Sequence, residues 1–365
     1  MAFNFWGKTR VVFLFMFVFP YAPIYAQGRV CLSNRSGGFD SGFPLAAMDS
    51  LLHPGNCDAF FYGETHTRYF EPMFKLHLVK MLHSEQGVRD VFMEMGFAPA
   101  VVFNRFLETG DTSLINIKVL YTTPYYMEFW KQLYRYNKVL PEDKKIRIHG
   151  VDFEATTAFF HALLLLVPDH AEIPEALNAT FRKLRAYSAK EAMNPKEFTE
   201  SVKEIKNAFH AHQDQIPKLY GTNYRMVNKI FDNDITMTDK LRDKKMYRHM
   251  QTVLTENNIT RFVGFFGGDH VNYEYKTSLP DQLIEGGMLK DKILTIRGVY
   301  FDAYDNWSHD TVECIGVYDE KEGHALHERY RDSSCRAILI PSGFKDNILK
   351  NSADFYLFVD DKARP

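Results

Sequence analysis

Acidic and imidazole side chains occur at or just after four apolar runs that we predict to be strands. These residues are, in chain order, Glu64, His66, Glu94, Asp152, Asp269 and His270. In open parallel sheets, ligands bind outside the carboxyl ends of the strands, so side chains that are distant in the sequence can converge there. The spacing therefore predicts one site assembled from several strand ends.

Glu64 and His66 lie two residues apart in a loop that begins at Gly63. A histidine held by carboxylates has its tautomer fixed and its basicity raised, which suits a general base acting on water near neutral pH. We expect His66 to be the catalytic base, Glu64 to orient its ring, and Glu94 to tune the site. The predicted reaction is hydrolysis of an ester-like, small-molecule substrate.

Other polar residues near these strand ends are candidates for substrate binding. We assign this role to His270, Arg68, Asp152 and Asp269. For Arg68 a surface ion pair is an equal alternative, and Asp152 could instead cap the following segment. Arg242 and Asp243, in a later predicted helix, either pair with the site or face solvent.

Two other kinds of ligand compete for the same region. His66, Glu94, Asp152 and His270 would suit a divalent metal ion, but no HExxH spacing is present, so we expect no metal. The many Tyr and Phe side chains leave open a binding protein for haem or another apolar ligand. A serine nucleophile is not expected, because the sequence has no GxSxG motif.

Alternating strand and helix patterns predict how these residues are positioned. Strands are expected at residues 59–62, 88–95, 145–151 and 261–266, and later at 293–301, 314–318, 337–341 and 355–359. Amphipathic helices are expected between the early strands, including 70–82 and an aromatic helix that begins at Pro124. The fold class is therefore α/β, with a mainly parallel central sheet covered by helices.

A long segment interrupts this alternation of strands and helices. It mixes polar and apolar residues in a pattern typical of helices and contains no strand pattern. We expect a signal peptide at 1–26, the first part of the α/β core at 27–155, a helical cap insertion at 156–235, and the second part of the core at 236–365. The insertion either shapes a pocket over the sheet or only braces it.

The N-terminus has the pattern of an export signal. Lys8 and Arg10 precede an uncharged run from Val11 to Ala26, and Gln27 is the expected mature start. A retained membrane anchor is the alternative, but the run is short and contains Pro20 and Pro23. We expect a periplasmic or secreted protein whose mature chain does not insert stably into a membrane.

The charge of the chain limits its possible binding partners, and its cysteine content indicates the cellular compartment. Lys and Arg total 44 against 46 Asp and Glu, so no positive field exists to attract nucleic acid. The four cysteines suit an oxidising compartment. We favour the local pairs Cys31 with Cys57 and Cys314 with Cys335, with four unpaired buried thiols as the alternative. The sequence gives no indication of the oligomeric state.

Several short motifs resemble those of erythromycin-esterase-like proteins, in the same order, over about residues 59 to 300. They are Gly63-Glu64-Thr65-His66, Phe92-Met93-Glu94, Asn104 with Gly110, Trp130 with Tyr136-Asn137, Gly150-Val151-Asp152, Arg242-Asp243 with Met246, and Gly268-Asp269-His270. The resemblance implies an α/β protein with a helical subdomain over a deep cleft. It also implies a histidine base that activates water without a metal, which would be His66, with His270 contacting the substrate or placing water.

One departure from the esterase pattern points to relatives with other functions. The esterase motif usually has two residues between Glu and His, whereas only Thr65 intervenes here. This shorter spacing is similar to the ChaN-like haem-uptake family, and Tiki-like metalloproteases share a related arrangement at strand ends. The resemblance therefore supports the superfamily more strongly than it supports esterase activity.

Overall fold

The computed structural model describes residues 30–34, 43–66, 68, 70–115, 124–190, 193–236, 241–273, 277–289, 292–305, 310–315, 320–330, 335–342 and 353–360. The predicted signal peptide and the cleavage site before Gln27 lie outside the described residues. Within the described part of the chain, no helix is both long enough and apolar enough to span a bilayer.

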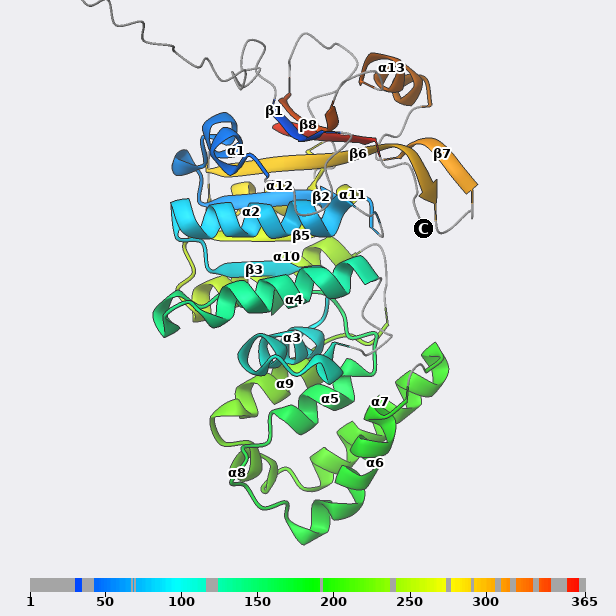
Figure 1. Ribbon diagram of the computed structural model, residues 1–365. Coiled ribbons are helices and arrows are strands. Elements are labelled where there is room, and N and C mark those ends of the chain that lie inside the picture. Colours follow the sequence, from blue (N-terminus) through cyan, green and yellow to red (C-terminus); the bar gives the residue numbers. More distant parts are fainter. Residues whose placement is uncertain are drawn as a thin grey trace, which may run out of the picture.

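A single nine-stranded sheet, in which parallel and antiparallel strands are combined, forms the centre of the molecule (Figure 1). Its strands are β1 (Val30–Asn34), β2 (Ala59–Glu64), β3 (Asp90–Met93), β4 (Arg147–Gly150), β5 (Phe262–Gly267), β6 (Ile293–Asp305), β7 (Asp310–Ile315), β8 (Cys335–Pro341) and β9 (Phe355–Asp360). The order across the sheet is β1-β8-β9-β6-β2-β5-β3-β4, and β7 pairs with β6. The run from β9 to β4 is parallel, whereas β1, β7 and β8 pair antiparallel.

Helices connect the parallel strands and cover the sheet, which confirms the predicted α/β class. They are α1 (Leu45–Leu52), α2 (Phe70–Gln86), α3 (Phe97–Thr109), α4 (Pro124–Lys138), α5 (Ala158–Leu165), α6 (Asn178–Ser188), α7 (Pro195–Ala211), α8 (Ile216–Tyr220), α9 (Tyr224–Asp232), α10 (Arg242–Glu256), α11 (Gly268–Val271), α12 (Leu279–Glu285) and α13 (Glu320–Tyr330). The predicted elements differ from these mainly at their ends. Strand β1 has no counterpart among the sequence predictions.

Alternating side chains of β2 fill two separate cores, one on each face of the sheet. Phe60 and Tyr62 pack into the core that includes α2 and α4. Ala59 and Phe61 pack into the other core, which includes α10 and α12. Successive strand residues point to opposite faces, so a strand covered on both faces is apolar throughout. This explains the uninterrupted apolar run that predicted β2.

Between β4 and β5, the described residues form the helices α5 to α10 and the loops that join them, with no strand among them. Figure 1 shows α6, α7 and α8 at the end of the molecule opposite β1 and β8. These helices extend the molecule beyond the β4 side of the sheet.

The disulfide in the structure joins strands rather than closing a local loop. Cys31 in β1 is bonded to Cys335 in β8, with the two Cα atoms 5.7 Å apart. The favoured pairs Cys31 with Cys57 and Cys314 with Cys335 were therefore wrong. The reason is topological: β1 pairs with β8, whereas β9 and β6 separate β8 from β2, next to which Cys57 lies as a free thiol.

Two asparagines occupy the outer edge of β4, the strand at one end of the sheet. The amide of Asn104 donates to the carbonyl of Ile148 at 2.8 Å and accepts from the N–H of Ile148 at 2.9 Å. Asn137 accepts from the N–H of Ile146 at 2.7 Å. These side chains take the place of a neighbouring strand, which protects an edge that would otherwise pair with another chain.

We predict that Asn104→Ala lowers the free energy of unfolding by about 1 to 3 kcal/mol, because it leaves an N–H and a C=O group of β4 without their partners. Urea unfolding measures this change. The neighbouring Arg105→Ala variant is the control, since it removes only an exposed ion pair with Glu108 and should cost less than about 1 kcal/mol. Equal unfolding midpoints for the two variants would contradict the role of Asn104.

Candidate functional site

A cluster of charged side chains lies where the parallel strands end. Glu64 is the last residue of β2, Glu94 directly follows β3, and Asp152 follows β4 by two residues. Because β2, β5, β3 and β4 are neighbours in this order, their carboxyl ends form one continuous edge. The sheet thus brings together side chains separated by up to 88 positions in the sequence.

His66 lies between two of these carboxylates. Its Nδ1 is 3.4 Å from Glu64 Oε2, and its Nε2 is 3.7 Å from Glu94 Oε2. The side chain is 47% exposed, although both carboxylates are largely buried. The backbone of His66 is left-handed, with φ of 56°, a conformation that is uncommon outside glycine and is held here by the surrounding loop.

Glu64 is held in its ionised form from the side opposite His66. Lys75 of α2 donates to Glu64 Oε1 at 2.9 Å, and the hydroxyl of Tyr126 in α4 donates to Glu64 Oε2 at 3.2 Å. Burial raises the pKa of Glu64, but the charge of Lys75 and the interaction with His66 outweigh it and lower that pKa to about 2. Glu64 is therefore a permanent negative charge beside the imidazole.

The sequence prediction missed Lys75 and Tyr126. Lys75 is only 1% exposed and lies among the apolar positions of α2. A lysine within an otherwise buried helix face was the available signal, because such a charge is almost never buried unless it is paired. Tyr126 gave no comparable signal, since it reads as one more aromatic residue of α4.

Glu94 is the centre of the second half of the cluster. It accepts from a guanidinium nitrogen of Arg242 and from the backbone N–H of Gly267, and His270 Nε2 is 3.5 Å from it. Although burial raises the pKa of Glu94, His270, His66 and Arg242 together hold it well below the usual range.

Arg242 and Asp243, at the start of α10, both belong to the cluster rather than to the solvent-facing surface. Arg242 donates to both oxygens of Asp152, with Nε at 3.2 Å from Oδ1, as well as to Glu94. Asp243 pairs with His270 Nδ1. Helix α10 thereby ties the ends of β3 and β4 to the loop after β5.

Both imidazoles of the cluster are protonated at neutral pH. Desolvation lowers the pKa of His66, but the hydrogen bond and charge of Glu64, together with the charge of Glu94, raise it to about 9. For His270, desolvation is likewise outweighed by Asp243 and Glu94, which raise its pKa to about 10. His66 is therefore more basic than the near-neutral base that the sequence suggested.

Two buried carboxyls next to the cluster shape the loops around it. Glu71 accepts from the N–H of Thr65 at 2.6 Å, and its burial together with the charge of Glu64 raises its pKa to about 7. Glu154 accepts from the N–H of Ala98 at the start of α3, and burial raises its pKa to about 7. These groups fix the loop before His66 and the beginning of α3.

A glycine allows the strand ends to approach this closely. A Cβ atom at Gly267 would lie 2.9 Å from His66 Nε2 and 3.2 Å from Glu94 Oε2. A larger residue would therefore displace the imidazole from its place beside Glu94. Gly267, rather than the neighbouring Gly268, has this steric role.

The cluster forms the polar side of a cavity of about 350 Å³. Its apolar side is made by Met95, Phe103, Trp130, Phe153 and Phe265. The rings of Phe103 and Trp130 are stacked, with centroids 3.8 Å apart, so this wall is well packed. A volume of this size suits a small organic molecule with an apolar portion. Among the described residues of the segment 156–235, Thr156 alone lines this cavity.

The structure places the predicted site residues in two groups. Glu64, His66, Glu94 and Asp152 line the cavity, and His270 contacts Glu94 behind it. Asp269 is exposed, and Arg68 is buried; neither lines the cavity. Among the described residues, no group of three or more His, Cys, Asp or Glu side chains is arranged to hold a metal ion.

Comparison with solved structures shows that this fold occurs in proteins of very different sequence. A Bacillus cereus protein aligns with a TM-score of 0.58 at 14% identity, covering 92% of this chain and 95% of that one. A succinoglycan biosynthesis protein aligns with a TM-score of 0.57 at 16% identity, covering 90% and 94%. A histidine-to-asparagine mutant of the erythromycin esterase EreC, in its open conformation, aligns with a TM-score of 0.55 at 12% identity, covering 88% and 96%.

These alignments confirm, at the level of fold, the resemblance to erythromycin-esterase-like proteins that the motifs indicated. No known family profile matches the sequence, and no curated protein matches it. At identities of 12 to 16%, the comparisons establish a shared fold alone.

We predict that Lys75→Met lowers the free energy of unfolding by about 3 kcal/mol, because it leaves the buried Glu64 without its cation. Lys80→Met, on the same helix, is the matched control: Lys80 lies over the ring of Tyr136, an interaction worth only about 1 kcal/mol. Chemical denaturation of both variants gives the comparison. A smaller loss for Lys75→Met than for Lys80→Met would show that Glu64 does not depend on this lysine.

We also predict that alkali weakens the fold through the two imidazoles. In the folded protein, the pKa values of His66 and His270 lie above their ordinary value of 6.5. Their contribution to stability is therefore complete below pH 6.5, declines as the pH rises, and is lost above about pH 9 to 10. Urea unfolding from pH 6 to 10 should show this decline, and a double His66→Asn, His270→Asn variant should show a flatter profile. Parallel profiles would contradict the assignment.

Proposed function

We propose that the protein is a hydrolase of ester-like bonds in which His66 activates water. The observation that carries this proposal is the position of His66: a half-exposed imidazole held between two carboxylates at the wall of a cavity. His83, by contrast, has both ring nitrogens bonded to the protein. The fold shared with the esterase EreC supports the same reaction class.

In this proposal, each group has a separate task. In its neutral form, His66 donates from Nδ1 to Glu64, which leaves Nε2 to accept a proton from water. The water oxygen forms a bond to the carbonyl carbon, and the bond from that carbon to the leaving oxygen breaks. The imidazolium then returns its proton to the leaving alcohol. Arg242 provides positive charge at the cavity wall, where negative charge develops on the carbonyl oxygen.

The raised pKa of His66 has a direct consequence for this mechanism. With a pKa of about 9, roughly one molecule in a hundred carries the neutral imidazole at pH 7. A substrate that reduces the negative potential around the ring would increase that fraction. The charges around His66 therefore affect the rate of the reaction, in addition to holding the ring in position.

The substrate class follows from the two sides of the cavity. The apolar wall of Phe103, Trp130 and Phe153 suits an aromatic or aliphatic portion, and the carboxylate cluster disfavours an anionic one. We therefore propose neutral or cationic esters with an apolar acyl or alcohol group. Export of the protein remains part of this proposal, supported by the N-terminal segment and by the bonded cysteines.

We predict that His66→Asn lowers kcat/KM on a panel of p-nitrophenyl esters by about 10² to 10⁴-fold, the usual contribution of a general base. For the unmodified protein, log kcat/KM should rise by about one unit per pH unit up to about pH 9, since only the neutral imidazole reacts. The exposed His210 gives a matched control, because His210→Asn should leave both the rate and the profile unchanged.

Other outcomes separate this proposal from its alternatives. Equal activity of His66→Asn and the unmodified protein would exclude His66 as the base. Turnover abolished by a chelator and restored by a divalent ion would instead support a metal-dependent hydrolase. Saturable haem uptake with a shifted Soret band, without turnover of any ester, would support a binding protein.

A further inference from the structure

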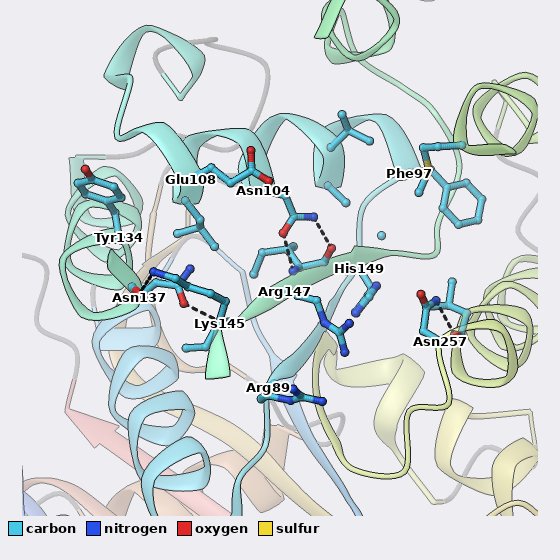
Figure 2. A pocket seen from close by; sticks show the side chains of 18 of the residues that line it. Arg89, Phe97, Asn104, Glu108, Tyr134, Asn137, Lys145, Arg147, His149 and Asn257 are labelled. Atoms are coloured by element: carbon cyan, nitrogen blue, oxygen red, sulfur yellow. Dashed lines mark hydrogen bonds between the residues drawn. The ribbon is translucent and has the colours of Figure 1, made fainter. Parts of the chain in front are cut away.

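A second cavity, of about 830 Å³, lies along the outer edge of β4 (Figure 2). It shares no lining residue with the cavity at His66. Helix α3 separates the two: Pro99 and Phe103 line the first cavity, whereas Val101 and Asn104 line the second. The second cavity therefore requires an explanation of its own.

This cavity extends to the amino ends of the strands, opposite the His66 site. Arg89 directly precedes β3 and Arg147 begins β4, whereas Glu94 and Asp152 follow the same strands. Asn257 follows the end of α10, and Arg242 begins that helix at the His66 site. A ligand in the second cavity would not contact the proposed catalytic groups.

Basic side chains outnumber acidic ones in the lining of the second cavity, although the overall charge of the chain is −2. The basic side chains are Arg89, Lys138, Lys145, Arg147 and Lys229, and the carboxylates are Glu108 and Glu142. Two of the basic side chains are already paired, Lys229 with Glu256 and Arg147 with Asp90. The remaining cations, in a concave and partly apolar surface, favour an anion.

Two adjacent arginines provide the donors for that anion. The backbone N–H of Arg147 donates to the carbonyl of Arg89 at 2.9 Å, so the two residues lie on neighbouring strands. Arg147 binds Asp90 through Nη2 at 2.9 Å, while its buried Nε has no hydrogen-bond partner. His149 binds the same Asp90 oxygen at 2.7 Å. The side chain of Arg147 is 43% exposed, so its other Nη group can reach an oxyanion, and so can the donors of Arg89 that do not bond the carbonyl of Asp143.

An apolar surface completes the second cavity. Phe97, Val101, Met226 and Val253 line it together with the polar groups, and Figure 2 shows Phe97 and Asn257 on one side of Arg147 and His149. Phe97 and Val253 are buried, whereas Val101 and Met226 are partly exposed, so a simple inorganic anion would leave the latter two in contact with water. An anion that carries an apolar portion would cover them and gain about 25 cal/mol for each Å² buried.

The edge strand itself cannot recruit a peptide by strand addition. The outward N–H and C=O groups of Ile148 are already bonded to Asn104, and the N–H of Ile146 is bonded to Asn137 (Figure 2). A peptide strand would have to displace both asparagines. The geometry therefore favours a small molecule over an extended chain.

We infer that this cavity is a second binding site, for a small amphipathic anion such as an alkyl phosphate or an aromatic carboxylate. Arg147 and Arg89 hold its oxyanion, and the partly exposed side chains of Val101 and Met226 contact its apolar portion. Binding at this second site does not require the hydrolase activity proposed above.

The test uses octyl phosphate, below its micelle concentration, as the probe in isothermal titration calorimetry with the full chain. We expect saturable binding of one molecule per chain and an affinity at least tenfold higher than that of inorganic phosphate. Arg89→Gln and Arg147→Gln should each weaken octyl phosphate binding by about tenfold or more, since a charge-assisted hydrogen bond is lost. Arg89→Gln leaves both ion pairs of Asp90 in place, so it stays informative if Arg147→Gln fails to fold.

Two controls locate the binding. Arg135→Gln removes one exposed arginine from α4 outside the cavity, and His66→Asn alters the other cavity; both should bind octyl phosphate as the unmodified protein does. The inference is overturned if the unmodified protein shows no saturable binding. It is also overturned if Arg135→Gln weakens binding as much as Arg89→Gln, if His66→Asn alone abolishes binding, or if inorganic phosphate binds equally well.

Discussion

The neutralisation of buried carboxylates by Lys75 and Arg242 is the interaction on which the rest of the site depends. Glu64, Glu94 and Asp152 lie close together where the strands end, and like charges in a buried environment repel strongly. Each cation comes from a helix on a different face of the sheet, Lys75 from α2 and Arg242 from α10. The site therefore exists only when both helical layers are packed against the strands, which couples its electrostatics to the fold.

The same interactions create a balance between stability and reactivity. The carboxylates that hold His66 in place also stabilise its protonated form, which strengthens the folded state and reduces the fraction of neutral base. Under the proposed mechanism, the carboxylates position the imidazole at the expense of activity near pH 7. His66 is the most exposed side chain of the described cluster, so a bound substrate would change its electrostatic potential most directly.

The two ends of the parallel strands have opposite electrostatic character. Carboxylates gather at the carboxyl ends of β2 and β3, whereas arginines gather at the amino ends of β3 and β4. Asn104 and Asn137 close the edge of β4 between these regions, so the sheet ends there without an exposed strand. The antiparallel part, tied by Cys31 and Cys335, lies at the other end of the sheet, away from both cavities.

The sequence by itself determined the α/β class, most strands, several of the longer helices, and the position of Glu64, His66 and Glu94 at strand ends. These features depend on local periodicity and on a general rule for parallel sheets, both of which are readable along the chain. Only the tertiary structure decided that Cys31 bonds to Cys335, that Lys75 and Arg242 complete the cluster, and that Arg68 and Asp269 lie outside the cavity. Strand order, helix packing and the pKa of a histidine depend on distances between segments far apart in sequence, and local patterns do not encode those distances.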